Sequence, residues 1–209
     1  SITLTLREGI KWSDGVPLTS DDFVFLFNDL LLNKEYSPVT PQEALGGKAV
    51  RISDRVFRYE FEEPTNPLYV NMLANAGNRM YVPRHFYQNF HPDYVDRTEL
   101  EDRISARHFV SWMAFITACR QQLIIESADA PALDSHRIVE RTTTLVRLES
   151  NPYYFKIDPA GQQLPYIDRI ESRQVDNHEI IQSLAVTGRL DFSAFHLKTQ
   201  NIPLLKLGE

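Results

Sequence analysis

Hydrophobic and polar residues alternate at the start of the chain and predict a β-strand. Ile2, Leu4 and Leu6 share one face while threonines occupy the other, which is the period-two pattern of a half-buried strand. The alternation is already established at the first residue, so the chain is expected to begin inside a strand. The segment Ser13-Asp14-Gly15 then predicts a reversal, because short polar side chains and a glycine suit a tight turn.

A helix is predicted from about Ser20 to Asn33. Thr19 followed three residues later by Asp22 is a variant of the capping box, and acidic residues suit the positive end of a helix dipole. The apolar positions of this helix are expected to share one face and to lie against a sheet. They are Phe23, Phe27, Leu30 and Leu31.

The middle of the chain combines a hairpin with helical segments. Residues 49–64, AVRISDRVFRYEFEEP, predict a hairpin that turns at Ser53-Asp54. Helical spacing of apolar residues follows in residues 66–76 and again in residues 96–123. The proline- and aspartate-rich residues 127–136 interrupt this pattern and predict a loop or a junction between lobes.

The last part of the chain returns to strands. Two strands around a polar turn are predicted in residues 136–155, and another strand in residues 164–175. Asp176 with Glu179 forms a second capping signal, and Gly188 is well placed to end the helix that follows. A further strand is expected after it. Such an alternation of hairpins and helices indicates a mixed α/β (α+β) sheet architecture rather than a helix bundle or a β-sandwich.

Composition excludes several classes of protein. The chain has 209 residues, of which 43% are hydrophobic and 24% charged, a balance typical of globular proteins. The net charge is -6 with both signs spread along the chain, which argues against a nucleic-acid partner. The apolar runs are far shorter than the roughly 20 residues of a membrane span. Cys119 is the only cysteine, so no intrachain disulfide can form, and we expect this thiol to be buried and inert.

Candidate chemistry is sparse. The six histidines lack metal-binding spacing, and the nearest pair, His85 and His91, is expected to be solvated. The sequence has no Gly-x-Ser-x-Gly elbow and no glycine-rich phosphate loop. The paired carboxylates Asp21-Asp22 and Glu62-Glu63 are better explained as a helix cap and a strand end than as an acid-base pair. We therefore predict no catalytic residue, no metal site and no cofactor.

Two segments carry a resemblance to a known family. Residues 4–25, LTLREGIKWSDGVPLTSDDFVF, resemble the signature segment of the family 5 extracellular solute-binding proteins, the oligopeptide, dipeptide and nickel receptors of bacterial ABC importers. Residues 148–170, LESNPYYFKIDPAGQQLPYIDRI, followed by TGRLDF at 187–192, are similar to the family's Asn-Pro-x-Tyr segment and its helix ending in Gly-x-x-Asp. The EFEEP strand and the YVPRHF turn fit between them, so the resemblance covers essentially the whole chain.

The resemblance implies a fold and a division of the chain. The fold expected is that of type II periplasmic binding proteins, with this sequence as an internal piece of lobe one of a two-lobe receptor. Residues 1–110 would form the small subdomain of lobe one, and residues 111–175 a helical segment and the return to the lobe-one sheet. Residues 176–209 would form a helix and a strand leading to the hinge, and the remaining lobes would lie outside this sequence.

The resemblance also implies a function without chemistry. Such a receptor captures an oligopeptide or peptide-like solute by closing two lobes around it, and then presents the closed form to an ABC permease of the inner membrane. The location implied is periplasmic or extracellular, with a lipid anchor where an N-terminal leader supplies one. Two alternatives remain open on the same scaffold: a peptide hydrolase, and a sensor or interaction module that does not transport.

Three residues are predicted to face the ligand. They are Tyr36, Asn75 and Asn78, because the loop LANAGNRM approaches the cleft in relatives. The sequence also departs from the family. APALDSHRIVE stands where many members have Gly-Pro-Tyr, and Val39 follows Ser37-Pro38 where peptide-binding relatives place a tyrosine. These departures loosen the inference to a peptide ligand.

Overall fold

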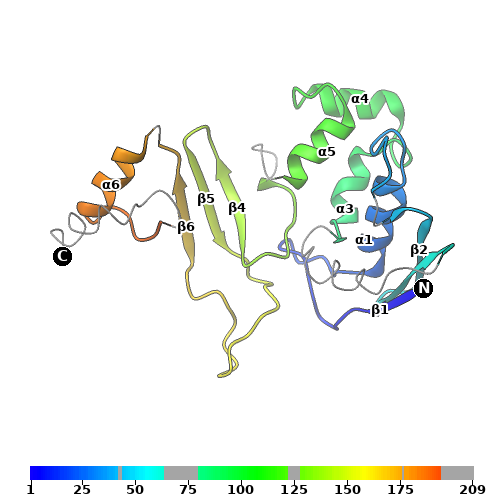
Figure 1. Ribbon diagram of the computed structural model, residues 1–209, viewed down its shortest axis with the longest axis horizontal. Coiled ribbons are helices and arrows are strands. Elements are labelled where there is room, and N and C mark those ends of the chain that lie inside the picture. The colour runs from blue at the N-terminus through cyan, green and yellow to red at the C-terminus, as the bar shows by residue number, and fades with distance from the viewer. Residues whose placement is uncertain (42–43, 64–79, 122–127, 176, 194–209) are drawn as a thin grey trace.

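Two antiparallel sheets, each with its own helices, make up the molecule (Figure 1). The computed structural model describes residues 1–41, 44–63, 80–121, 128–175 and 177–193. The first sheet and most of the helices come from residues before 121, and the second sheet and the last helix come from residues after 135. The segment between the two parts runs through residues 128–135 and forms one wall of the site described below.

The first sheet contains the strand and the hairpin that the alternating pattern predicts. Its strands are β1 (Ile2–Thr5), β2 (Gly47–Ser53) and β3 (Val56–Phe61), in the order β1-β3-β2. Both pairings are antiparallel, and Leu4 lies opposite Phe57. The side chains of Phe57 and Tyr59 are buried on one face. The hairpin prediction is confirmed, because alternate aromatic residues of β3 supply the buried face of the sheet.

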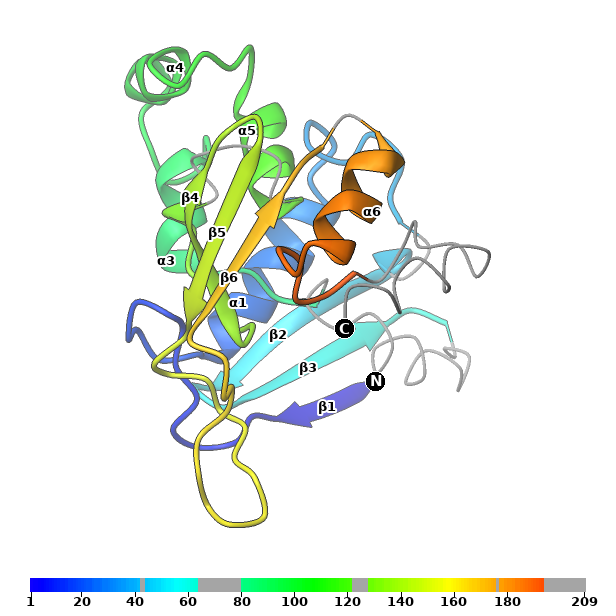
Figure 2. The same ribbon diagram turned by 90° about the vertical axis from the view of Figure 1, so that its left-hand side faces the viewer.

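The first helix lies against this sheet (Figure 2). It begins as α1 (Ser20–Val24), with Asp22 accepting a hydrogen bond from the backbone N–H of Thr19, as the predicted capping box requires, and continues as a π-helical segment, η1 (Phe25–Leu31). Phe27 packs with the aromatic residues of the sheet. The single apolar face predicted from the sequence is wrong for Leu30, which packs in a second cluster on the side of the other helices. The helix is therefore buried on two sides.

A cluster of short helices covers the side of η1 that faces away from the sheet. These elements are α3 (Arg84–Tyr87), the 3-10 turn η4 (Gln88–Phe90), α4 (Arg97–Ser105) and α5 (Trp112–Arg120). Asp96 and Ser111 cap α4 and α5 with side-chain hydrogen bonds, so both helices begin where polar side chains satisfy the first backbone N–H groups. The prediction of helical structure in residues 96–123 is confirmed over these two helices. The helix predicted at 66–76 lies outside the described residues.

The second sheet follows the predicted order of strands. It contains β4 (His136–Arg141), β5 (Leu145–Ser150) and β6 (Arg169–Arg173), paired antiparallel as β4-β5-β6. The final helix, α6 (His178–Val186), ends before Gly188, whose φ of 65° fits a left-handed helix end. Two details differ from the prediction. The side chain of Asn177, one residue after the predicted Asp176, caps α6, and Leu190 and Phe192 do not lie in a strand. Asp176 itself and the residues after 193 lie outside the described residues.

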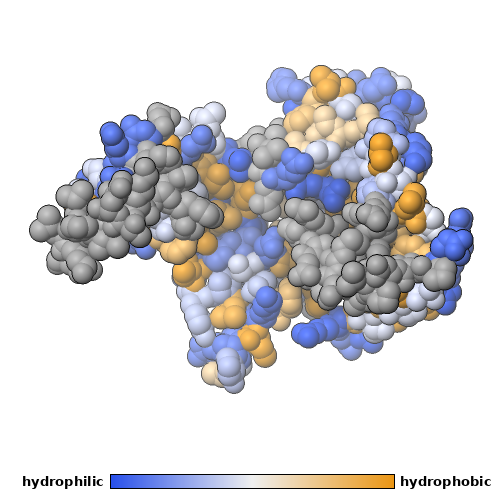
Figure 3. Space-filling model, in the orientation of Figure 1, coloured by the Kyte–Doolittle hydropathy of each residue, from blue (hydrophilic) through white to orange (hydrophobic). Residues whose placement is uncertain are grey.

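The connection between β5 and β6 projects from the second sheet (Figure 1). It contains a short bridge between Ile157 and Gln163 and a hydrogen bond from the hydroxyl of Tyr166 to Asp158. Hydrophobic side chains are exposed along it, and Figure 3 shows orange and blue atoms side by side on this projection. The mixed surface indicates a solvated excursion and not a buried element.

The mixed α/β class predicted from the sequence is confirmed by these elements. The thiol of Cys119 is buried, as expected, in the helical cluster. Among the helices of the described residues, none has both the length and the apolar character needed to cross a bilayer. The division of the chain at 110 and 175 stays a prediction.

Candidate functional site

A cleft of about 610 Å³ opens where the helical cluster meets the segment before β4. One wall comes from Tyr36 and from the end of α5, and a second wall comes from residues 130–134. The residues at the end of α5 are Thr117, Cys119, Arg120 and Gln121. Trp12, residues 81–83 and Tyr87 complete the lining. We refer to this space as the cleft. Its lining combines aromatic side chains with a few polar groups, as ligand sites usually do.

Arg120 and Tyr36 form a connected pair on the first wall. The guanidinium Nη1 of Arg120 donates a hydrogen bond to the hydroxyl of Tyr36 at 3.1 Å. The hydroxyl of Thr117 donates to the same oxygen at 3.4 Å, and the ring of Tyr36 stacks on Trp112 at 5.7 Å between ring centroids. Tyr36 is therefore held from both its ring and its hydroxyl.

Two further tyrosines contribute neutral hydroxyl groups. Burial, together with the nearby charge of Asp134, raises the pKa of Tyr81 to about 12. Burial also raises the pKa of Tyr87 far above its usual value. Both hydroxyls consequently stay protonated at any physiological pH and can donate hydrogen bonds without carrying charge.

Asp134 is the acidic group of the cleft. Burial raises the pKa of its carboxyl above the usual value of an aspartate. No side chain in the described part of the molecule forms an ion pair or a hydrogen bond with this carboxylate. The lining of the cleft thus contains a positive group, Arg120, and an acidic group, Asp134.

The wall that carries Asp134 is held by hydrogen bonds from the two segments that resemble the solute-binding family, residues 4–25 and 148–170. Ser13 forms a reciprocal pair of hydrogen bonds with Ala132, from Ser13 N to Ala132 O and from Ala132 N to Ser13 Oγ, each 3.0 Å. The buried side chain of Asn151 donates to the carbonyl oxygens of Asp134 at 3.0 Å and Ala132 at 3.4 Å. Because Ser13 belongs to the predicted turn and Asn151 to the Asn-Pro-x-Tyr segment, both motifs position this wall of the cleft.

These two segments also touch each other. A Cβ atom at Gly15 would lie 3.1 Å from the hydroxyl oxygen of Tyr153, and the ammonium group of Lys11 lies 5.5 Å from the centre of the Tyr153 ring. Gly15 has a φ of 90°, which an L-residue with a side chain rarely adopts. Glycine is therefore required at this position for both its backbone conformation and its close contact.

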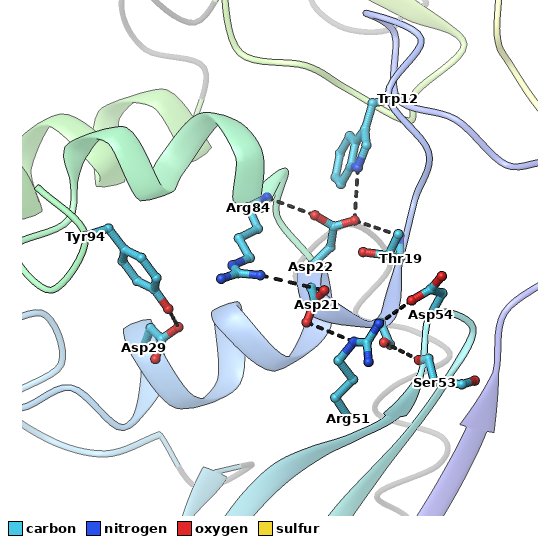
Figure 4. A network of polar contacts seen from close by, with 11 residues as sticks. Trp12, Thr19, Asp21, Asp22, Asp29, Arg51, Ser53, Asp54, Arg84 and Tyr94 are labelled. Atoms are coloured by element: carbon cyan, nitrogen blue, oxygen red, sulfur yellow. Dashed lines mark hydrogen bonds and ion pairs between the residues drawn. The ribbon is translucent and has the colours of Figure 1, made fainter.

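Asp22 holds Trp12, which lines the cleft, through a buried set of hydrogen bonds (Figure 4). Its Oδ2 accepts from the indole N–H of Trp12 at 3.1 Å and from the backbone N–H of Thr19 at 2.9 Å, while its Oδ1 accepts from the backbone N–H of Arg84 at 2.9 Å. Burial raises the pKa of Asp22, and these hydrogen bonds oppose that shift. The carboxylate joins the start of α1, the start of α3 and the Trp12 ring that lines the cleft.

Around this carboxylate, a more exposed network ties α1 to the hairpin and to α3 (Figure 4). Asp21 forms ion pairs with Arg51 at 3.3 Å and with Arg84 at 3.6 Å. The hydroxyl of Ser20 donates to the carbonyl oxygen of Ser53 at 2.6 Å. Asp21 and Asp22 therefore have structural roles, which agrees with their interpretation as a helix cap.

Of the three residues predicted to face the ligand, the structure describes only Tyr36. Tyr36 lines the cleft, and its role in ligand binding stays a prediction. Asn75 and Asn78 lie outside the described residues. The sequence analysis did not identify Arg120, Asp134, Tyr81 or Tyr87. Only the proline- and aspartate-rich segment around Asp134 gave a local signal, and that signal indicated a loop and not a ligand.

The histidine pair considered for a metal is separated into two structural roles. His85 contacts Asp14 at 2.7 Å between Nε2 and Oδ2, so it has an acidic neighbour that the sequence did not reveal. His91 is fully buried, with its Nε2 bonded to the carbonyl oxygen of Asp29 at 2.9 Å. The expectation that both are solvated is wrong for His91. In the part of the chain that the structure describes, no three His, Cys, Asp or Glu side chains gather as metal ligands do.

Comparison with known proteins shows that the chain is similar to solute-binding proteins. Residues 1–100 match the model of the bacterial extracellular solute-binding proteins, family 5 Middle. The periplasmic alpha-galactoside-binding protein of Rhizobium meliloti is 29% identical over 175 residues, which are 81% of this chain and 22% of that protein. These matches confirm the resemblance recognised in the sequence.

Solved structures confirm the fold. An oligopeptide-binding protein, OppA, superposes with a TM-score of 0.85 at 29% identity, over 99% of this chain and 34% of that chain. The periplasmic binding protein MelB of Agrobacterium fabrum, in complex with stachyose, superposes with a TM-score of 0.70 at 25% identity, over 98% of this chain and 29% of that chain. This chain thus spans between about a fifth and a third of these relatives, which are binding proteins for peptides or for sugars by name.

Proposed function

We propose that this chain, as a relative of the family 5 extracellular solute-binding proteins, forms part of a receptor that captures a solute for an ABC importer. The observation that carries the proposal is the cleft of about 610 Å³, whose lining pairs aromatic rings with Arg120 and an acidic group, Asp134. A site of this composition can hold a polar organic ligand by hydrogen bonds and ring contacts. Capture needs no covalent step.

The mechanism proposed is closure of two lobes around the solute. A ligand that contacts both lobes stabilises the closed form by its differential affinity for that form. The cleft residues in this chain would supply one side of the contact, and the second lobe would supply the other. The closed receptor would then dock on a permease in the membrane, at a periplasmic or extracellular location.

The first ligand class is a peptide or a peptide-like solute. Arg120 and Asp134 both line the cleft and carry opposite charges, which complements a ligand that carries both a carboxylate and an ammonium group. The neutral hydroxyls of Tyr81 and Tyr87 can serve main-chain carbonyl groups without selecting a particular side chain. The similarity to an oligopeptide-binding protein supports this class.

An oligosaccharide is the second ligand class. The relative aligned over 81% of this chain is named for alpha-galactosides, and one superposed structure holds stachyose. Aromatic rings such as Trp12 and Tyr36, next to charged groups that donate or accept hydrogen bonds, also suit sugar rings with their many hydroxyls. The departures from the peptide receptors around Val39 and in APALDSHRIVE loosen the inference to a peptide ligand.

Calorimetric titration of the natural full-length protein tests the proposal. Trialanine and stachyose serve as probes of the two ligand classes, and each sample is examined afterwards by mass spectrometry. We expect saturable binding of one probe, which is recovered unchanged. Absence of binding to both probes contradicts solute capture of either class, and cleavage of the recovered probe supports a hydrolase in its place.

A further inference from the structure

Arg120 differs from Arg51 and Arg84 in its lack of an acidic partner within the described residues. Arg51 and Arg84 form ion pairs with Asp21. Within the described residues, no carboxylate lies within ion-pair distance of Arg120, whose hydrogen bond is the one that Nη1 donates to Tyr36. The remaining N–H groups of its guanidinium therefore have no acceptor in this part of the chain.

The geometry around Arg120 holds the guanidinium in place. Tyr36 accepts from Arg120 and from Thr117, and its ring is fixed by stacking on Trp112. This wall of the cleft thus presents several hydrogen-bond donors side by side, and Arg120 loses little further freedom when it binds a ligand.

We propose that Arg120, positioned by Tyr36, binds a pair of oxygen atoms of the captured solute. The inference rests on the proposed function, because it assigns a ligand group to the same cleft. A guanidinium group offers parallel N–H donors that match two neighbouring acceptor oxygens. The carboxylate of a peptide and two adjacent hydroxyls of a sugar both supply such a pair.

Substitutions in the natural full-length protein test this assignment, with trialanine and stachyose as probes in calorimetric titration. Arg120→Met removes the donors, Arg120→Lys keeps the charge but not the parallel geometry, and Tyr36→Phe removes the acceptor that holds the guanidinium. Arg97→Met is the matched control, because the side chain of Arg97 on α4 is 73% exposed and does not line the cleft. The melting temperature of each variant is measured alongside, so that loss of fold is recognised.

For the probe that the wild-type protein binds, we expect Arg120→Met to weaken binding about tenfold or more, as loss of charged hydrogen bonds does. Arg97→Met should leave binding unchanged. Tyr36→Phe should weaken it by a smaller factor, and should add nothing in the Tyr36→Phe/Arg120→Met double variant, because Tyr36 acts through Arg120.

The salt dependence of binding and the Arg120→Lys variant also distinguish the two sources of the oxygen pair, a carboxylate and two adjacent hydroxyls. A carboxylate predicts that added salt weakens binding and that Arg120→Lys keeps part of the affinity. A pair of hydroxyls predicts insensitivity to salt and a loss in Arg120→Lys as large as in Arg120→Met. Wild-type binding together with an Arg120→Met affinity within twofold of it overturns the inference alone, whereas a wild-type protein that binds neither probe overturns the proposed function and the inference with it.

Discussion

Asp22→Asn is expected to destabilise the protein although it changes only one side-chain atom. Asp22 is buried and accepts from three N–H groups, those of Trp12, Thr19 and Arg84. An asparagine can place its oxygen where Oδ2 accepts from Trp12 and Thr19, but its amide group then faces the N–H of Arg84. One hydrogen bond is lost, and two donors oppose each other in a site that water does not reach.

The magnitude follows from these losses. An unsatisfied buried donor and a lost hydrogen bond to a charged group together cost about 2 to 4 kcal/mol. Removal of a charge offsets part of this cost, because burial raises the pKa of Asp22 and its ionised form is therefore disfavoured in the folded state. We expect a net loss of about 1 to 3 kcal/mol in the free energy of unfolding at neutral pH.

Urea denaturation of the natural full-length protein, followed by tryptophan fluorescence, measures this loss. Asp21→Asn is the matched control, because Asp21 precedes Asp22 and forms partly exposed ion pairs with Arg51 and Arg84. Exposed pairs contribute about 1 kcal/mol or less, so the control should change stability little. The reasoning is refuted when both variants lose the same free energy.

The pKa of Asp22 also predicts how the difference in stability between the wild type and Asp22→Asn depends on pH. Because the folded-state pKa of Asp22 is raised above 3.8, the wild-type protein gains stability from this group as the pH falls through that raised pKa and loses it as the pH rises. Asp22→Asn cannot take up this proton. The difference in stability between the wild type and Asp22→Asn should therefore widen as the pH is lowered from 7 toward about 4, and a constant or shrinking difference would contradict the assignment.

Three other perturbations have defined outcomes. Gly15→Ala should lower the free energy of unfolding in urea by about 1 kcal/mol more than Gly9→Ala does. Both positions have positive φ (90° and 81°), but only at Gly15 would an added Cβ contact the hydroxyl of Tyr153. Equal losses would show that this contact does not contribute. Asn151→Ala should lower the free energy of unfolding by about 2 to 3 kcal/mol and weaken solute binding, because the buried amide of Asn151 holds the wall that carries Asp134. Unchanged binding at lowered stability would show that this wall does not contact the solute. Because the pKa of Tyr81 is raised to about 12 in the folded state, this side chain ionises first in the unfolded chain, and the wild-type protein should lose stability between about pH 10 and about pH 12. A Tyr81→Phe variant whose stability falls equally steeply over this range would contradict the raised pKa.

The sequence predicted local elements well where one periodicity governs a segment. The β2–β3 hairpin followed from alternating residues that include Phe57 and Tyr59, both buried in the structure. The first helix followed from its capping signal, but its π-helical second half and its two buried sides did not. Leu30 packs against helices that begin more than 50 residues later in the chain. The periodicity of the helix itself cannot predict a contact with such distant residues.

The site was less accessible to sequence analysis, because its parts meet only after folding. Arg120 ends one helix and shows no local motif, and its partner Tyr36 lies 84 residues away. Ser13 and Asn151 were interpreted as parts of a turn and of a family segment, yet they also hold the same residue, Ala132, across separations of 119 and 19 residues. The motifs were recognised, but their joint position on one wall could be learned only from the structure.

Native mass spectrometry of the natural full-length protein, purified gently from its source, tests the central claim of solute capture most directly. The account predicts a species that carries an additional mass, which is released on denaturation and matches a peptide or an oligosaccharide. The same preparation of Arg120→Met should carry much less of that mass, while Arg97→Met should carry as much as the wild type. A wild-type protein without such a mass, both as purified and after incubation with trialanine and stachyose, would contradict the account.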